Sequence, residues 1–155
     1  MISDAYLAVL RWLVSELDGV NWVLTGSLSF ALRGLPLEPH DIDIQTDQAG
    51  AYTIERRFAA QVQRPVTFVE SDRMRSYLGA LLLEGLTVEI MGDIQKRPEN
   101  GDWEPPVELY RYKRYIDIAG MRVPVLSLAY EAEAYRRMGR LERAEMLRRA
   151  ALQEA

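Results

Sequence analysis

Three short segments that follow one another without interruption constrain the fold of this chain more than any other feature. Residues 21–25 are apolar and rich in strand-forming side chains, Gly26 and Ser27 follow at once, and residues 28–33 have the composition of a helix. Thirteen residues separate Ser27 from residues 41–44, where aspartate and isoleucine alternate as in a strand with one buried face. The sequence therefore predicts a strand, a glycine turn and a helix, and then an acidic strand.

The alternation places the two aspartates of the acidic strand on the same face. Asp41 and Asp43 are two residues apart, so they point one way while Ile42 and Ile44 enter the core. Their α-carbons are expected to lie about 6.6 to 7 Å apart, which lets both carboxylates approach one divalent cation. Oxygen ligands select hard cations such as Mg²⁺ or Mn²⁺, and Mg²⁺ is usually shared with substrate phosphates. We therefore predict that both aspartates bind a metal and take part in catalysis on a nucleoside triphosphate.

A third carboxylate is expected from a later strand. Within residues 86–91, Glu89 is out of phase with Val88 and Ile90 and so faces away from the core that they enter. We predict Glu89 as the third metal-binding and catalytic acid, although one acid on an amphipathic strand is also compatible with a solvated face. Asp93 has the same parity but lies beyond the expected strand, and it is the reserve candidate.

Gly26 and Ser27 are the predicted phosphate-binding residues. Glycine lets the backbone approach a phosphate closely, and the amides that begin the following helix attract an anion. The Ser27 hydroxyl is either a further phosphate ligand or a helix cap. Lys96 and Arg97 lie in an expected loop and either reach the triphosphate or are solvated loop charges. His40, at the entrance of the acidic strand, is either a phosphate ligand or an exposed side chain.

The composition limits the kinds of site that the chain can build. It has no cysteine and one histidine, which excludes disulfides, thiolate zinc sites and histidine-rich metal clusters. Its 155 residues suit a single domain, with a core at about residues 1–126 and C-terminal helices at about residues 127–155. The N-terminus lacks a basic secretion signal, and no apolar run approaches the roughly 18 to 20 residues that span a bilayer. We therefore expect a cytoplasmic protein without membrane contact.

The charge distribution does not favour an extended nucleic-acid surface. The formal net charge is −4, and the basic residues are spread along the chain instead of being collected in one tract. Residues 110–115 alternate aromatic and basic side chains, a pattern found in proteins that bind single strands. We interpret this segment as a strand with one buried and one solvated face.

The remaining pattern predicts an α+β fold, with a mixed sheet flanked by helices and followed by a C-terminal helical pair. Helices are expected from Ser3 to before Gly19, then over residues 28–33, 47–60, 127–138 and 141–152. Strands are expected over residues 21–25, 41–45, 66–69, 77–83, 86–91, 115–118 and 122–125, with tight turns at residues 84–85 and 119–120. Residues 92–106 are rich in glycine, proline, asparagine and charge, and are expected to form a loop.

The order Gly26-Ser27, thirteen residues, Asp41-Ile42-Asp43, and Glu89 on a later strand resembles the signature of the nucleotidyltransferase superfamily typified by DNA polymerase beta. The resemblance extends over most of the chain and includes small bacterial members and, more distantly, kanamycin and lincosamide nucleotidyltransferases. It implies that the three acids hold Mg²⁺ or Mn²⁺ and that the glycine-serine turn holds the triphosphate. It also implies attack of an acceptor hydroxyl on the α-phosphate with release of pyrophosphate. Glu89 would be a metal ligand, a general base on the acceptor, or both.

Two departures from that signature bear on the substrate. Thr25 stands where the superfamily usually has an apolar residue, and residues 37–40 lack the arginine that often precedes the acidic strand in antibiotic-modifying members. We expect transfer of AMP to an unidentified hydroxyl acceptor, a small molecule or a protein. The alternative is an antitoxin-like or regulatory module that acts on or binds a protein partner, with catalysis either directed at that partner or lost. The C-terminal helices would permit a homodimer in either case.

Overall fold

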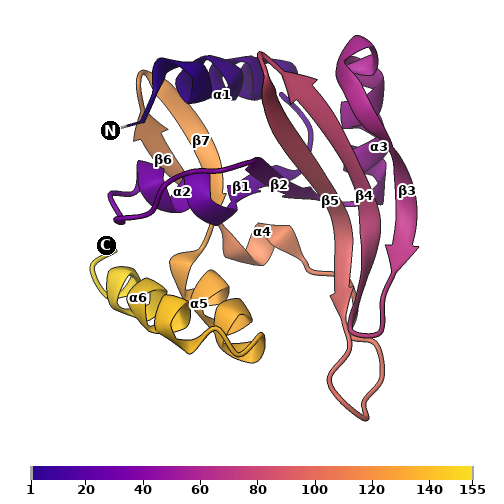
Figure 1. Ribbon diagram of the computed structural model, residues 1–155, viewed down its shortest axis with the longest axis vertical. Coiled ribbons are helices and arrows are strands. Elements are labelled where there is room, and N and C mark those ends of the chain that lie inside the picture. Colours follow the sequence, from indigo (N-terminus) through magenta and orange to yellow (C-terminus); the bar gives the residue numbers. More distant parts are fainter. Residues whose placement is uncertain (1, 155) are drawn as a thin grey trace.

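A seven-stranded mixed sheet forms the centre of the molecule, in the order β3-β4-β5-β2-β1-β7-β6 (Figure 1). The computed structural model describes residues 2–154. The strands are β1 (Trp22–Thr25), β2 (Ile42–Thr46), β3 (Val62–Glu70), β4 (Met74–Leu83), β5 (Leu86–Lys96), β6 (Lys113–Ile118) and β7 (Met121–Leu126). The helices are α1 (Asp4–Glu16), α2 (Gly26–Leu32), α3 (Gln48–Arg57), α4 (Leu109–Tyr112), α5 (Leu128–Arg137) and α6 (Leu141–Ala151), with one 3₁₀ turn, η1 (Ala59–Gln61). Strand β2 is antiparallel to β1 and parallel to β5, and β1 is parallel to β7. The α+β prediction is confirmed.

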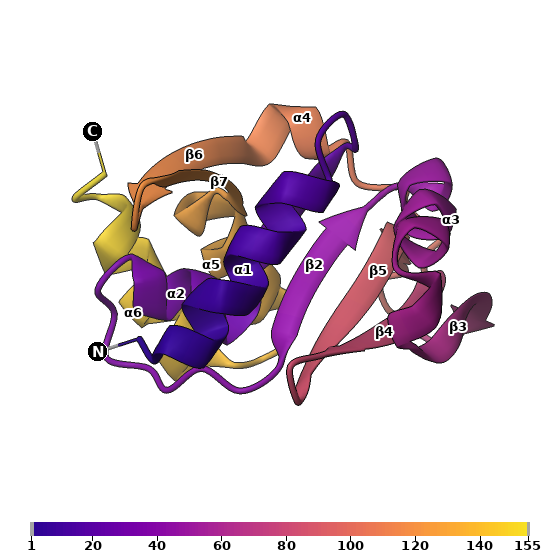
Figure 2. The same cartoon turned by 90° about the horizontal axis from the view of Figure 1, so that it is seen from above.

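Helices α1 and α3 cover one face of the sheet (Figure 2). Strands β2 and β5 present alternate side chains to them, and Ile42, Ile44 and Val88 are fully buried there. The two helices also meet each other, since the rings of Trp12 and Phe58 lie 5.5 Å apart between centroids. The alternation in the sequence therefore assigns the isoleucines of β2 to this core and leaves its acidic positions on the opposite face.

The opposite face is covered only over part of its width. Strands β1 and β7 carry Val23 and Leu126, which pack with Leu109 of α4. Helices α5 and α6 lie beyond, and they form a second small core with Phe30 of α2. On the same face of β3 and β4 large apolar side chains stay exposed, among them Val69, Met74 and Leu82. The acidic positions therefore lie where the covered part of the sheet meets the open part.

Local sequence signals account for most element boundaries. The turns at residues 84–85 and 119–120 close antiparallel hairpins, as predicted. The Asp47 carboxylate accepts a hydrogen bond from the Gly50 backbone N–H at 2.7 Å and so caps α3, and the Ser127 hydroxyl accepts one from the Tyr130 N–H at 3.2 Å and caps α5. The strand predicted at residues 66–69 is longer in the structure, because β3 pairs with β4 from Val62 to Glu70.

The prediction of a loop from residue 92 is wrong for its first five residues. Strand β5 continues to Lys96, and β4 stays paired with it, since Gly92 lies opposite Tyr77 and Gln95 opposite Arg75. Between these pairs β5 has one residue more than β4, which defines a β-bulge. Asp93 takes up the extra length with a φ of 48°, in the left-handed region. A glycine followed by a charged residue marks this bulge and not the end of the strand.

The interpretation of residues 110–115 as a strand is also wrong at its start. Residues 109–112 form the short helix α4, and β6 begins only at Lys113. Leu109 is buried between β1 and β7, and Tyr112 packs beside it, three positions later as on a helix. Among residues 2–154 no helix is long and apolar enough to cross a membrane.

The Asp47 cap gives a first test of these boundaries. Asp47→Ala removes an acceptor from the first turn of α3 and is expected to lower the free energy of unfolding by about 1 kcal/mol. Ser3→Ala is the matched control, because Ser3 precedes α1 without making a side-chain cap bond. It is expected to change stability by less than about 0.5 kcal/mol. Urea denaturation of both variants measures the difference, and equal losses would contradict the cap assignment.

Candidate active site

One lateral row of the sheet brings the acidic side chains together. Thr25 of β1 is opposite Asp43 of β2, and Asp43 is opposite Glu89 of β5. Glu89 is in turn opposite Ala80 of β4, which is opposite Arg64 of β3. Residues directly opposite one another share a face of the sheet. Two of the three predicted acids, from segments 46 residues apart in the chain, are therefore direct neighbours.

Asp43 lies against the glycine turn. A Cβ atom built on Gly26 would stand 2.6 Å from the Asp43 Oδ2 atom, and Gly26 also has a φ of +74°. Both observations require glycine at this position, so the turn and the carboxylate are fitted to each other. Burial raises the pKa of Asp43 to about 6, with smaller contributions from the charges of Glu89 and Asp41. Burial, and to a smaller extent the neighbouring charges, thus destabilise the ionised carboxylate, a cost that a bound cation would reduce.

The three acids lie close together, but they do not yet converge. Asp41 precedes β2, contrary to its expected place within the strand, and is exposed. Glu89 is turned toward Arg64, whose Nη2 atom donates to both carboxylate oxygens at 2.6 and 2.8 Å. Within residues 2–154 no group of three acidic or histidine side chains is already arranged to hold a metal. The donor set nevertheless fits a hard cation in its chemistry, because all three side chains are carboxylates.

Ser27 holds the turn to the chain that enters the acidic strand. Its hydroxyl accepts a hydrogen bond from the His40 backbone N–H at 3.1 Å. Tyr6 of α1 donates to the His40 carbonyl at 2.7 Å from the other side. The His40 backbone is therefore fixed, while the residue is exposed. Thr25 precedes α2 at the N-cap position, so the alternative of Ser27 as the helix cap is not realised, and the Ser27 hydroxyl keeps its proton for another acceptor.

A cavity of about 240 Å³ opens beside Asp43, between the sheet and α5. Its wall includes Thr25 and Asp43 from the acidic row, Gly26 from α2, Met91 and Lys96 from β5, and Tyr130, Glu131 and Tyr135 from α5. Met91 and Lys96 are an odd number of residues apart, so regular alternation would place their side chains on opposite faces of β5. The bulge at Asp93 shifts the alternation by one residue, and both side chains therefore reach the same cavity. Burial lowers the pKa of Lys96, and Arg137 lowers it further, while Glu104 and Glu131 act in the opposite direction.

The structure separates Arg97 and Asp93 from this cavity. Arg97 donates to an Asp72 carboxylate oxygen at 2.9 Å, and its guanidinium lies 4.8 Å from the centre of the Trp103 ring. The Asp93 carboxylate accepts from the Gln48 backbone N–H at 3.0 Å, at the start of α3. Of the two predicted basic ligands Lys96 therefore reaches the cavity and Arg97 does not, and the reserve acid Asp93 supports a helix end.

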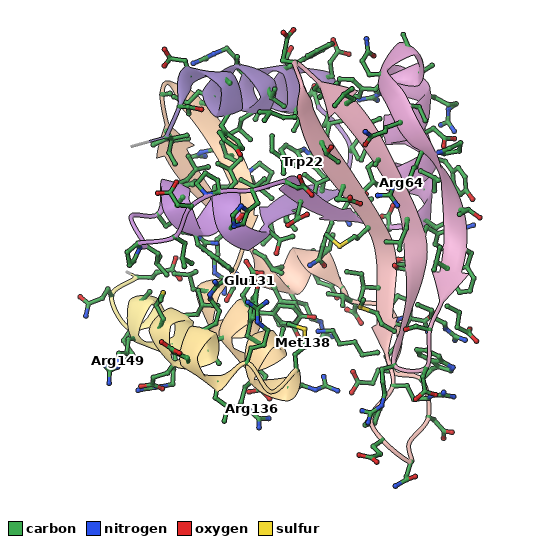
Figure 3. All side chains as sticks on the ribbon, in the orientation of Figure 1. Trp22, Arg64, Glu131, Arg136, Met138 and Arg149 are labelled. Carbon is green, nitrogen blue, oxygen red and sulfur yellow. The ribbon has the colours of Figure 1, made fainter. Side chains whose placement is uncertain are left out.

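Sequence reasoning missed Glu131, a buried acid on α5. It is 5% exposed, accepts from the Thr25 hydroxyl at 2.5 Å and faces Arg33, whose Nη2 atom is 3.8 Å from Glu131 Oε2. Figure 3 shows it extending from α5 toward α2. Arg33 donates to the carbonyl and hydroxyl of Ser29, and that hydroxyl donates to the Gly26 carbonyl. A polar Thr25 in an apolar strand was the signal that a buried partner existed.

Glu131 also has a shifted protonation equilibrium. Burial raises its pKa to about 7, and the charge of Asp43 acts in the same direction. Hydrogen bonds from Thr25 and the Gly26 backbone and the charge of Arg33 oppose this effect. Among the described side chains the Oε2 atom of Glu131 and the Nη1 atom of Arg33 are buried without a hydrogen-bond partner. The carboxyl group of Glu131, whose pKa is close to neutral, therefore lies directly behind the glycine turn.

Comparisons with known proteins place these observations in a family. A protein-family profile described as aminoglycoside-2''-adenylyltransferase matches residues 8–151. The chain belongs to this family. A crystal structure of a "putative nucleotidyltransferase" from Thermotoga maritima shares 52% sequence identity and has a TM-score of 0.86, covering 99% of this chain and 97% of that one. The superfamily resemblance predicted from the sequence is confirmed.

More distant structures of the same fold are adenylyltransferases that modify antibiotics. The lincomycin-bound lincosamide adenylyltransferase LnuA has a TM-score of 0.60 at 13% identity, over 94% of this chain and 98% of that one. ANT(2'')-Ia in complex with adenylyl-2''-tobramycin has a TM-score of 0.55 at 12% identity, over 94% and 88%. At these identities the likeness shows the fold alone. The comparison with curated proteins finds no match.

Replacing the turn glycine tests its contact with Asp43. Gly26→Ala must adopt a positive φ and also displaces the Asp43 carboxylate, whereas Gly34→Ala at φ +85° meets nothing within 4 Å. The control is expected to lose about 1 to 2 kcal/mol of stability, for the backbone alone. Gly26→Ala is expected to lose at least about 1 kcal/mol more. Chemical denaturation measures both, and losses of equal size would show that the carboxylate is not held against the turn.

The buried Glu131 predicts a dependence of stability on pH. Its folded-state pKa of about 7 lies above the ordinary 4.5, so the folded protein keeps a proton that the unfolded chain has released. This contribution to stability is complete below about pH 4.5 and is lost as the pH rises past 7, and it amounts to about 2 to 3 kcal/mol. The free energy of unfolding should therefore fall more between pH 5 and pH 8 in the wild type than in Glu131→Gln.

Glu133→Gln is the control for this measurement. Glu133 is an exposed acid on the same helix, and its hydrogen bond with Arg136 lowers its pKa, so it does not titrate between pH 5 and pH 8. That variant should retain the wild-type pH dependence. An identical pH dependence in wild type and Glu131→Gln would show that Glu131 is not protonated in the folded state.

Proposed function

We propose that this protein transfers AMP from ATP to an acceptor hydroxyl with release of pyrophosphate. The observation that carries the proposal is the placement of Asp43 between the glycine turn and Glu89, with Asp41 two residues before it. The family description supports adenylyl transfer as the reaction. The acceptor is a hydroxyl group of a small molecule or a protein.

The three predicted acids supply the metal ligands in this proposal. Asp41, Asp43 and Glu89 would hold Mg²⁺ or Mn²⁺ through their carboxylate oxygens. When bound, the cation would neutralise phosphate charge and activate the transferred group toward a nucleophile. The raised pKa of Asp43, caused first by burial and then by Glu89 and Asp41, supports this assignment because like charges in one row favour a cation between them. Glu89 would act either as a metal ligand or as the base that takes the acceptor proton.

The residues around the row would bind the triphosphate. Gly26 leaves space at the start of α2, and the Ser27 hydroxyl retains a proton for a phosphate oxygen. Lys96 contributes a positive charge to the wall of the adjoining cavity. Glu131 and Thr25 would act from behind the turn, by fixing the backbone of Gly26. These side chains would orient the donor, and the open half of the sheet face beside Glu89 would receive the acceptor.

Nucleotide binding and turnover test the proposal separately. Calorimetry should show ATP binding that requires Mg²⁺ and that falls at least about tenfold in Asp43→Asn, because the variant removes a charge from the metal site without changing its shape. Asp117→Asn, on the distant β6–β7 hairpin, is the control and should bind as the wild type does. Binding that is unchanged in Asp43→Asn would refute the site.

The release of pyrophosphate then distinguishes an enzyme from a binding module. A panel of hydroxyl acceptors that includes small molecules and proteins should identify at least one that releases pyrophosphate with ATP. Magnesium-dependent ATP binding without pyrophosphate release from any acceptor would favour the regulatory alternative instead.

A further inference from the structure

A single ion pair occupies both oxygens of the third acid. The Nη2 atom of Arg64 donates to Oε1 of Glu89 at 2.8 Å and to Oε2 at 2.6 Å. Both residues remain accessible to solvent, since the Arg64 side chain is 55% exposed and the Glu89 side chain 28%. Figure 3 shows Arg64 on the long strands at the open side of the sheet. The orientation of the Glu89 carboxylate is therefore set by its ion pair with Arg64 of β3.

The register of three strands produces this contact. Arg64, Ala80 and Glu89 lie in one row across β3, β4 and β5. Ala80 is fully buried and stands between the two charged residues. Its methyl group is small enough for the arginine side chain to extend across β4, whereas a larger side chain would project into that path. The row continues beyond Glu89 to Asp43, so Glu89 has a cation on one side and a carboxylate on the other.

These two neighbours place competing demands on Glu89. Its carboxylate relieves the positive charge of Arg64, but the same oxygens would be needed to complete a metal site with Asp41 and Asp43. In the described residues Glu89 is paired with Arg64, and no three acids are arranged to hold a metal. An ion pair that is half exposed to water is weakly held, since solvent screens both charges. A divalent cation close to Asp43 can therefore compete for Glu89.

We propose that Arg64 is a positioning residue that withholds Glu89 from the metal site until metal and nucleotide are bound. The inference rests on the proposed function, since it assigns Glu89 to that metal site. On binding, Glu89 exchanges the arginine for the cation, and the guanidinium is released on the open face of β3 and β4. The pair thus keeps three carboxylates from repelling one another in the free protein and sets the affinity for the metal.

A purely structural role of Arg64 makes a different prediction for the metal affinity. An arginine that only joins β3 to β5 would contribute to stability and would leave the affinity for metal unchanged. An arginine that withholds Glu89 lowers the apparent metal affinity, because part of the binding free energy is used to break the pair. The dissociation constant for metal separates the two roles without any measurement of turnover.

The experiment titrates Mn²⁺ into protein saturated with a nonhydrolysable ATP analogue and measures free Mn²⁺ by electron paramagnetic resonance. Arg64→Ala is expected to lower the dissociation constant about two- to fivefold, the range for removal of a competing exposed ion pair. Arg64→Lys should stay close to the wild type, because it restores the charge. In the Glu89→Gln background Arg64→Ala should have no effect. An unchanged or raised dissociation constant in Arg64→Ala would overturn the inference.

Arg122→Ala is the matched control. Arg122 is likewise an exposed arginine that pairs with a carboxylate on a neighbouring strand, 3.4 Å from Asp117, but it lies at the other edge of the sheet. The dissociation constant of the Arg122→Ala variant for Mn²⁺ should equal that of the wild type. A decrease as large as that of Arg64→Ala would mean that net charge alone changes the affinity, and would overturn the specific role of Arg64.

A crystal structure of the wild type with Mn²⁺ and the same analogue gives a second measurement that does not depend on any variant folding. The Arg64 to Glu89 contact should be broken, and retention of both hydrogen bonds with metal bound would overturn the inference. Equal Mn²⁺ affinity in wild type and Arg64→Ala, together with pyrophosphate release, would refute only this inference. The absence of Mn²⁺ binding in every protein would refute the proposed function and this inference with it.

Discussion

The register of β1, β2 and β5 is the constraint on which the rest of the structure depends. It sets Asp43 opposite Thr25 on one side and opposite Glu89 on the other, while Ile42 and Ile44 enter the core beneath α1 and α3. A shift of one residue in β2 would bury Asp43 among apolar side chains and expose the isoleucines. The same register that closes the core therefore fixes the acidic row, and the stability of the fold and the geometry of the site have one common origin.

Arginine-glutamate pairs lie at both ends of that row, in contrasting surroundings. At the open end Arg64 pairs with Glu89 in contact with water, and at the covered end Arg33 faces Glu131 in the interior. Solvent screening makes the first pair easy to break. The second is imperfectly hydrogen-bonded and buried, and replacing one member leaves the other without compensation. The chain thus has a solvent-exposed ion pair that is easily broken at the open side of the sheet and a buried pair behind the glycine turn.

The sequence was sufficient for features that depend on local periodicity. The phase of Asp43 against Ile42, the outward direction of Glu89, the Asp47 and Ser127 caps and the two hairpin turns all follow from neighbours in the chain. Features set by contacts between distant segments were not predictable. Arg64 reaches Glu89 only because β3, β4 and β5 pair in one register, and Glu131 meets Thr25 only after α5 docks beside β1. The continuation of β5 past Gly92 likewise depends on its pairing with β4.

The bulge at Asp93 has a consequence for how this chain tolerates change in length. Side chains before it and after it reach the same cavity only because one additional residue resets the alternation, as Met91 and Lys96 show. Loss of a single residue there would exchange the surroundings of Lys96 and Arg97, so that the guanidinium would enter the cavity and the ammonium would meet Trp103. A variant of this chain that lacks the additional residue would therefore present an arginine side chain instead of a lysine side chain to the same cavity.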